Sequence, residues 1–86
     1  MAKVEIYTTD YCPYCKKAKA LLDKKGIEYE EIDISHDEPT MRAKLAQMTG
    51  GRSSVPQIFI NGESIGGSDD LMELNSSGKL DEMLSK

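Results

Sequence analysis

The stretch TTDYCPYCKKAKALL, residues 8 to 22, contains the only two cysteines of the 86-residue chain, Cys12 and Cys15. The residue after Cys12 is a proline, which suits the first position of a helix because its missing N–H would have no partner there. The apolar residues that follow recur at helical spacing. The pattern therefore predicts a helix over residues 13–25, closed by Gly26, since glycine readily adopts the left-handed conformation at a helix C-terminus. Cys12 is then expected to cap the N-terminus of this helix.

Strands and further helices are expected on both sides of this helix. The patterns predict strands over residues 3–8, 27–34, 57–60 and 63–67, helices over residues 38–49 and 68–78, and a last short helix within residues 79–86. In the helix over residues 38–49, Met41, Leu45 and Met48 form the expected apolar stripe. The first two strands are joined by a helix and should be parallel, whereas the Asn-Gly pair at residues 61–62 predicts an antiparallel hairpin. This β-α-β-α-β-β-α order predicts a single α/β domain over residues 1–86, with a four-stranded mixed sheet and helices on both faces.

The composition excludes several classes of function. The chain carries 11 basic and 15 acidic side chains, a net charge of −4, which argues against binding to nucleic acid. No apolar run approaches the ~20 residues that span a bilayer, and the polar N-terminus does not resemble a secretory signal. We therefore expect a cytoplasmic protein that binds no membrane. The positive charges of Lys16, Lys17 and Lys19 follow Cys15 closely and favour a small anionic ligand near the cysteines.

Two cysteines at this spacing have three interpretations: half of a metal site, a structural disulfide, or a dithiol that performs chemistry. A structural zinc site needs four ligands, and this chain offers one cysteine pair and one histidine, His36. A disulfide across two residues stabilises little, because the effect of a cross-link grows with the length of the loop that it closes. We therefore expect no metal site within one chain, while a metal shared between two chains stays an alternative.

The dithiol interpretation has physical support of its own. At a helix N-terminus the free N–H groups and the helix dipole stabilise a thiolate over a thiol. Cys12 should therefore be the exposed, attacking sulfur. Cys15 lies on the apolar face of the helix and should be more buried and less ionised. Thiol–disulfide exchange uses this division, in which one thiolate attacks and a second thiol resolves the mixed disulfide.

Three motifs together resemble the dithiol glutaredoxins of the small bacterial kind, which belong to the thioredoxin-like superfamily: CPYC at residues 12–15, SSVPQIFI at 53–60 and GGSDDL at 66–71. The resemblance covers nearly the whole chain and implies a thioredoxin fold. It also implies glutathione-dependent reduction of protein disulfides and of protein–glutathione mixed disulfides. In that scheme Cys12 becomes glutathionylated, Cys15 can close a redox-active Cys12–Cys15 disulfide, and glutathione restores the enzyme. The implied partners are glutathione and glutathionylated or disulfide-containing proteins, with ribonucleotide reductase as one candidate, and we expect a monomer.

The resemblance also implies a glutathione site. Its expected members are Tyr14, Arg52, Ser54, Val55, Pro56, Gly67, Ser68, Asp69 and Asp70. Pro56 is cis in this family, which presents the backbone of Val55 to the peptide groups of the ligand. The N–H groups at the start of the helix after Gly67 can hold a carboxylate, and Asp69 or Asp70 can meet the ammonium group. This sequence departs from the family at Thr9, where a lysine often binds the glycyl carboxylate of glutathione, so Arg52 is the candidate for that role.

Two other functions remain as alternatives. A thioredoxin-type protein disulfide reductase is one, although the tyrosine between the cysteines and the absence of tryptophan weigh against it. The other is an iron–sulfur carrier, a dimer that holds one cluster through Cys12 of each chain and two glutathione molecules. Relatives of that kind usually have a single cysteine in the motif, whereas the function favoured here requires no metal.

Overall fold

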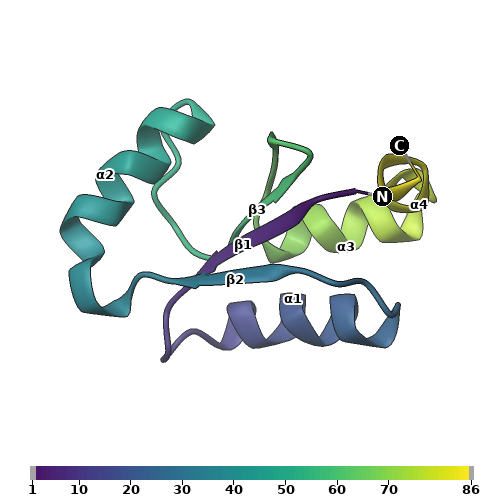
Figure 1. Cartoon of the computed structure of the whole chain (residues 1–86), viewed down its shortest axis with the longest axis horizontal. Coiled ribbons are helices and arrows are strands. Elements are labelled where there is room, and N and C mark those ends of the chain that lie inside the picture. The colour runs from purple at the N-terminus through teal and green to yellow at the C-terminus, as the bar shows by residue number, and fades with distance from the viewer. Residues whose placement is uncertain (1, 86) are drawn as a thin grey trace.

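The computed structural model describes residues 2–85 and forms one layered α/β unit (Figure 1). In chain order the elements are β1 (Val4–Thr8), α1 (Pro13–Lys24), β2 (Glu30–Asp33), the 3₁₀ turn η1 (Ser35–Asp37), α2 (Glu38–Thr49), β3 (Gln57–Ile60), β4 (Glu63–Gly66), α3 (Ser68–Ser76) and α4 (Lys79–Leu84). The predicted order of strands and helices is confirmed, including the short last helix.

The four strands form one mixed sheet in the order β2-β1-β3-β4. β1 is parallel to β2 and antiparallel to β3, and β3 is antiparallel to β4 across the Asn61–Gly62 turn. Both residues of this turn have positive φ angles, 54° and 83°, as a tight hairpin between twisted strands requires. The loop after β1, which carries Cys12, therefore lies at the carboxyl end of the parallel pair β1 and β2, beside the start of the antiparallel strand β3.

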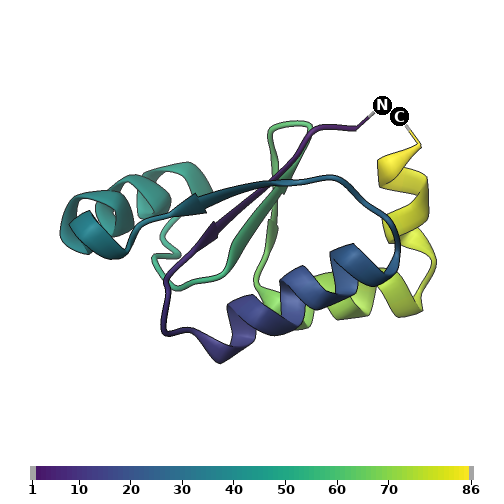
Figure 2. The same ribbon diagram turned by 60° about the horizontal axis from the view of Figure 1, so that its bottom comes forward.

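Each face of the sheet covers its own core, because successive side chains of a strand point to opposite faces. The larger core packs under α1, α3 and α4, and its buried members are Val4, Ile6, Ala18, Leu22, Ile58, Ile60, Leu71 and Leu80. The smaller core lies under α2 and consists of Tyr7, Ile34, Leu45 and Phe59, with the rings of Tyr7 and Phe59 edge to face at 5.6 Å. Figure 2 shows α1 and α3 together below the sheet, with α2 apart from them at one end.

The C-terminus of α1 explains why the second strand is shorter than predicted. Gly26 has a φ of +70°, its N–H donates to the carbonyl of Asp23, and the N–H of Ile27 donates to the carbonyl of Leu22. These two bonds close the helix in the Schellman manner. The expected strand over residues 27–34 was therefore wrong at its start, since the backbone of Ile27 completes the helix cap. Pairing with β1 begins only at Glu30.

The helix α2 has the predicted bounds, but one residue of its predicted apolar stripe was wrong. Leu45 is fully buried and Met41 packs beside it, whereas Met48 is 41% exposed. Thr49, four residues after Leu45, is half-buried, and its hydroxyl lies 2.7 Å from the Leu45 carbonyl oxygen of its own helix. The helix therefore packs on the smaller core through Leu45 and Met41, whereas Met48 faces largely toward solvent. Within residues 2–85, no helix is both long enough and apolar enough to cross a membrane.

Candidate active site

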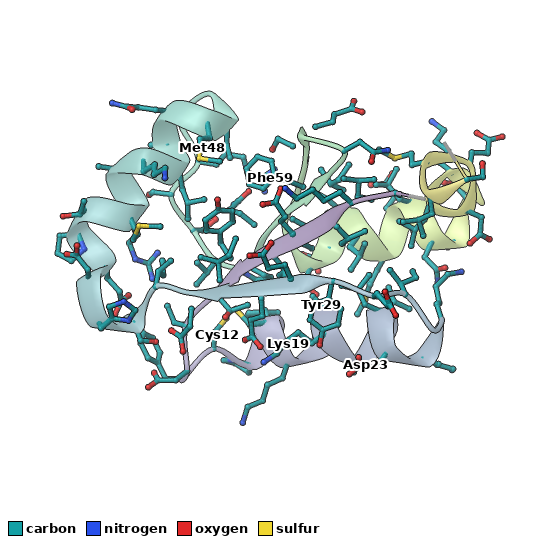
Figure 3. All side chains as sticks on the ribbon, in the orientation of Figure 1. Cys12, Lys19, Asp23, Tyr29, Met48 and Phe59 are labelled. Carbon is teal, nitrogen blue, oxygen red and sulfur yellow. The ribbon has the colours of Figure 1, made fainter. Side chains whose placement is uncertain are left out.

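Cys12 occupies the N-cap of α1, as predicted. Its sulfur accepts a hydrogen bond from the backbone N–H of Cys15 at 3.2 Å, and it lies 3.7 Å from the carbonyl oxygen of Val55, to which its thiol can donate. No acidic residue lies in the first turn of α1. The N-terminal end of the helix dipole therefore faces the sulfur, with no acidic side chain of that turn beside it. Figure 3 shows Cys12 at the start of α1, with Lys19 farther along the same helix.

Cys15 lies one turn later, on the buried side of α1. It is 1% exposed, and Cys12 is 8% exposed. The predicted order of exposure is confirmed, but the expectation of an exposed Cys12 was wrong, because Val55 and the start of the helix cover most of the residue. Burial raises the pKa of the Cys15 thiol to about 12, and the hydrogen bond with Cys12 acts in the same direction, while the backbone of Thr9 opposes them. Cys15 is therefore a thiol at neutral pH.

A hollow of about 150 Å³ opens near the start of α1, where Tyr14 lies in its wall. Its walls are formed by Tyr14, Arg52, Ser54, Val55, Pro56, Gly67, Ser68, Asp69 and Asp70. These are the residues that the sequence assigned to a ligand, and they come from three separate segments of the chain. Cys12 is not in these walls, but its sulfur lies 3.7 Å from the carbonyl oxygen of Val55, which is one of the lining residues.

The segment before β3 forms one wall of the hollow. The Val55–Pro56 peptide bond is cis, as the resemblance implied. Val55 is half-buried and Ser54 is exposed, and the hydroxyl of Ser54 lies 3.2 Å from the side-chain nitrogen of Gln57. The carbonyl oxygen of Pro56 lies opposite Gly67, where an added Cβ would approach it to 3.3 Å. The two walls of the hollow are therefore close at Gly67, and a larger residue there would narrow it.

The start of α3 forms the opposite wall and binds its own carboxylate. The Asp70 side chain accepts a hydrogen bond from the N–H of Gly67 at 3.0 Å. It also forms an ion pair with Arg52 at 3.2 Å. The bond from Gly67, and next the one from Arg52, hold the pKa of the Asp70 carboxyl below its usual range. Asp69 is exposed, and the hydroxyl of Ser68 is buried without a hydrogen-bond partner. Of the two acids, Asp70 is thus engaged in capping and Asp69 faces solvent.

Aromatic and polar side chains complete the surroundings of Cys12. Tyr14 is 55% exposed at the edge of the hollow, and the ammonium group of Lys17 lies 5.6 Å from the centre of its ring. Thr9 is buried, and its hydroxyl has no hydrogen-bond partner. Thr9 is not among the residues that line the hollow. Lys16 and Lys17 are exposed on α1.

Comparisons with known proteins identify the family of the chain. The chain matches the glutaredoxin family over residues 4–65. It is 52% identical to glutaredoxin 1 of Rickettsia prowazekii (strain Madrid E) over 79 residues, which cover 92% of this chain and 83% of that protein. The chain belongs to the glutaredoxin family. It is also 46% identical to glutaredoxin 3 of Escherichia coli (strain K12), over 98% of this chain and 99% of the relative.

The glutaredoxin fold is shared as well. The structure superposes with a TM-score of 0.89 on the crystal structure of a buckwheat glutaredoxin–glutathione complex, which is 37% identical and is matched over 98% of this chain and 77% of that one. The four-stranded sheet with its flanking helices is thus the thioredoxin fold of glutaredoxins. Membership of this family makes the protein an enzyme, a thiol–disulfide oxidoreductase.

Other features of this glutaredoxin had no clear signal in the sequence. The pairing of Arg52 with Asp70 joins residues 18 positions apart, and neither residue type at its position indicates the other. The glycine before Gly67 has a structural reason as well, since Gly66 has a φ of +115° and a Cβ there would lie 2.8 Å from the Arg52 guanidinium. In the part of the chain that the structure describes, no three or more His, Cys, Asp or Glu side chains gather as a metal site.

Proposed function

We propose that this protein uses glutathione to reduce protein–glutathione mixed disulfides and protein disulfides through Cys12 and Cys15. The observation that carries the proposal is the hollow beside Cys12, whose walls match what glutathione offers. Glutathione has two carboxylates, one ammonium group and an extended peptide backbone. The hollow offers the start of α3, an arginine, an exposed acid and the backbone of Val55.

Each part of glutathione has a candidate partner. The peptide backbone of the ligand would pair with Val55, next to the sulfur of Cys12. One carboxylate would meet the N–H groups at the start of α3, where the hydroxyl of Ser68 has no partner in the protein. The ammonium group would meet Asp69, because Asp70 is already bound by Gly67 and Arg52. The Arg52 guanidinium, half-exposed at the rim, is the candidate for the second carboxylate.

The proposed chemistry begins with the thiolate of Cys12. It attacks the glutathione sulfur of a protein–glutathione mixed disulfide, the old S–S bond breaks, and the protein thiolate leaves and takes up a proton. A second glutathione, as its thiolate, attacks the glutathione sulfur now bound to Cys12. This step releases oxidised glutathione and regenerates the Cys12 thiolate.

The dithiol route uses Cys15 for protein disulfides. After Cys12 has attacked one sulfur of the substrate, Cys15 loses its proton and attacks the Cys12 sulfur, which forms the Cys12–Cys15 disulfide. The substrate leaves as a dithiol after protonation. Two glutathione molecules then reduce the Cys12–Cys15 disulfide and become one oxidised glutathione, so that the electrons balance.

The setting of this activity follows from its chemistry. Glutathione-driven reduction needs a compartment with a reduced glutathione pool, so we place the protein in the cytoplasm. Residues 1–86 would act as a single domain and as a monomer, because Cys12, Cys15 and the whole hollow come from one chain. Its protein partners would be glutathionylated or disulfide-containing proteins, with disulfide-forming enzymes such as ribonucleotide reductase among them.

The test is a coupled assay with a glutathionylated peptide, glutathione, glutathione reductase and NADPH. Wild-type protein should turn over the peptide, and Cys12→Ser should be inactive because a hydroxyl does not form a mixed disulfide. Cys15→Ser should keep activity on the glutathionylated peptide. Its reduction of a protein disulfide should fall at least ~100-fold, since no internal thiol remains to resolve the intermediate.

The alternatives give different results in the same assay. Turnover that appears only when thioredoxin reductase replaces glutathione reductase would identify a thioredoxin-type reductase. No turnover with either electron source, together with a coloured dimer that contains iron, would indicate a cluster carrier. Equal loss of both activities in Cys15→Ser would contradict the assignment of Cys12 as the attacking residue.

A further inference from the structure

A chain of hydrogen bonds passes from the loop before α1, through α2, to the segment before β3. The Tyr11 hydroxyl donates to the Glu38 carboxylate. Arg42, one turn later on α2, donates to the same carboxylate oxygen from Nη2 at 2.9 Å and from Nε at 3.2 Å. The third nitrogen of Arg42, Nη1, donates to the backbone carbonyl of Ser53 at 2.8 Å. We call Tyr11, Glu38, Arg42 and the Ser53 carbonyl the α2 bridge.

The α2 bridge joins the two segments that meet at the reactive sulfur. Tyr11 directly precedes Cys12, and Ser53 lies two residues before Val55. Elsewhere these segments approach each other where the Cys12 sulfur lies 3.7 Å from the Val55 carbonyl. A single helix, α2, therefore connects the two segments that form the contact between the Cys12 sulfur and the Val55 carbonyl.

The α2 bridge contains more hydrogen bonds than an ordinary surface ion pair, and its charged side chains are less exposed. The side chains of Arg42 and Glu38 are 32% and 26% exposed, and Arg42 uses all three of its nitrogens. A planar guanidinium can hold a carboxylate and a carbonyl at fixed positions at the same time, whereas a lysine ammonium acts as a point charge. Ser53 lies in a segment without helix or strand structure, so the Arg42 bond is a specific restraint on it.

We propose that Glu38 and Arg42 are positioning residues that hold the Ser53–Val55 backbone at the correct distance from Cys12 for the bound glutathione group. The proposal rests on the proposed function. Neither side chain lines the hollow, and neither touches the sulfur. They act through the carbonyl of Ser53, and so on the backbone edge that pairs with the ligand.

This arrangement predicts an effect on binding more than on the chemical step. The N–H of Cys15, which supports the Cys12 sulfur, belongs to α1 and does not depend on α2. Without Arg42, the Ser53 carbonyl loses its donor and the backbone edge becomes less ordered before the substrate binds. The free-energy cost of ordering this backbone segment then weakens binding of the glutathione group. The weaker binding raises KM.

The experiment measures kcat and KM for a glutathionylated peptide in Arg42→Met. Because a hydrogen bond with a charged group contributes roughly 1.5 kcal/mol, we expect KM to rise about tenfold with kcat within about twofold of wild type. Arg42→Lys should recover part of the rise, since an ammonium can replace only one of the two contacts. Lys44→Met, at an exposed position of the same helix, is the matched control and should change neither constant.

A second readout separates positioning from damage to the fold. In a Cys15→Ser background, the rate at which iodoacetamide alkylates Cys12 should be the same with and without Arg42→Met. Should Arg42→Met prove too unstable to purify, Glu38→Gln keeps the shape of the side chain and should raise KM about threefold through weaker bonds to Arg42 and Tyr11.

The inference and the function fail in different ways. Wild-type protein without glutathione-dependent turnover would remove the proposed function itself. A wild-type enzyme with normal turnover, but with unchanged KM in Arg42→Met and Glu38→Gln, would overturn only the role of the α2 bridge. A fall in kcat with an altered alkylation rate would also overturn it, because the bridge would then act on Cys12 and not on the backbone edge.

Discussion

The starts of α1 and α3 both face the active site, but they are capped in opposite ways. The N-cap of α1 is Cys12, whose sulfur accepts from the N–H of Cys15, and the first turn contains no acidic residue. The N-cap of α3 is Gly67, and the first turn contains Asp69 and Asp70, of which Asp70 accepts from the Gly67 N–H. The start of α1 thus faces the Cys12 sulfur, which gains charge during the proposed reaction. The start of α3 already binds the permanent charge of Asp70.

The difference shows how one structural element serves chemistry in one place and recognition in another. At α1, the N-terminal end of the helix dipole faces the sulfur that takes part in the proposed chemistry. At α3, Asp70 and Arg52 form an ion pair within the protein, and Asp69 beside them is exposed and available to a ligand. The predictions below test the two helix starts separately.

The largest expected effect concerns the α1 side and its pH dependence. The pKa of Cys15 is raised to about 12, chiefly by burial. Only the thiolate attacks, so the rate at which glutathionylated Cys12 is closed to the disulfide should rise about tenfold per pH unit, or about 100-fold from pH 6.5 to 8.5. Acid quenching followed by mass spectrometry measures this rate, with Cys15→Ser as the blank. A plateau below pH 8 would show that a nearby base removes the proton.

The next effect distinguishes binding from capping on the α3 side. Asp69→Asn should raise KM for a glutathionylated peptide about tenfold, because it removes a charged partner of the ligand ammonium, and should leave stability unchanged. Asp70→Asn weakens the bonds to Gly67 and Arg52 and should lower the free energy of unfolding by about 1 kcal/mol. Urea titration and steady-state kinetics of both variants provide the comparison. The reverse pattern would assign the ammonium group to Asp70.

The smallest effect concerns a glycine that makes room for this fixed charge pair. Gly66 and Gly51 have nearly the same φ, 115° and 119°, but only at Gly66 would a Cβ meet the side chains of Asp70 and Arg52. Both alanine variants should lose stability from backbone strain, and Gly66→Ala should lose about 1 kcal/mol more because the carboxylate must leave its cap. Urea unfolding of the two variants isolates this difference. Equal losses would mean that the pair moves aside without cost.

The sequence predicted most of the fold because its signals are local. A proline after Cys12, Gly26 and the Asn61–Gly62 turn each act within a few residues, and the structure has each feature where it was expected. The start of β2 was wrong because the backbone of Ile27 closes α1 instead of pairing with a strand. The prediction that Met48 belongs to the buried stripe was wrong, because helical spacing does not determine the orientation of a helix on its sheet.

The site was predictable where a motif carried it and unpredictable where distant side chains meet. The structure gathers Tyr14, Val55 and Asp69 around one hollow, as the motifs suggested. The limited exposure of Cys12 was not foreseen, because it depends on Val55, 43 residues away. The α2 bridge also combines three segments, and a tyrosine, a glutamate and an arginine at such separations are not distinctive in a sequence.

The hydrogen bond from the backbone N–H of Cys15 to the sulfur of Cys12 has an evolutionary consequence. The group that supports the Cys12 sulfur is the backbone N–H of residue 15, not its side chain. Any residue at that position that preserves the helix would supply the same donor. A lineage could therefore lose the second thiol in one substitution and keep the first one reactive, so that two-cysteine and one-cysteine enzymes are neighbours in sequence space.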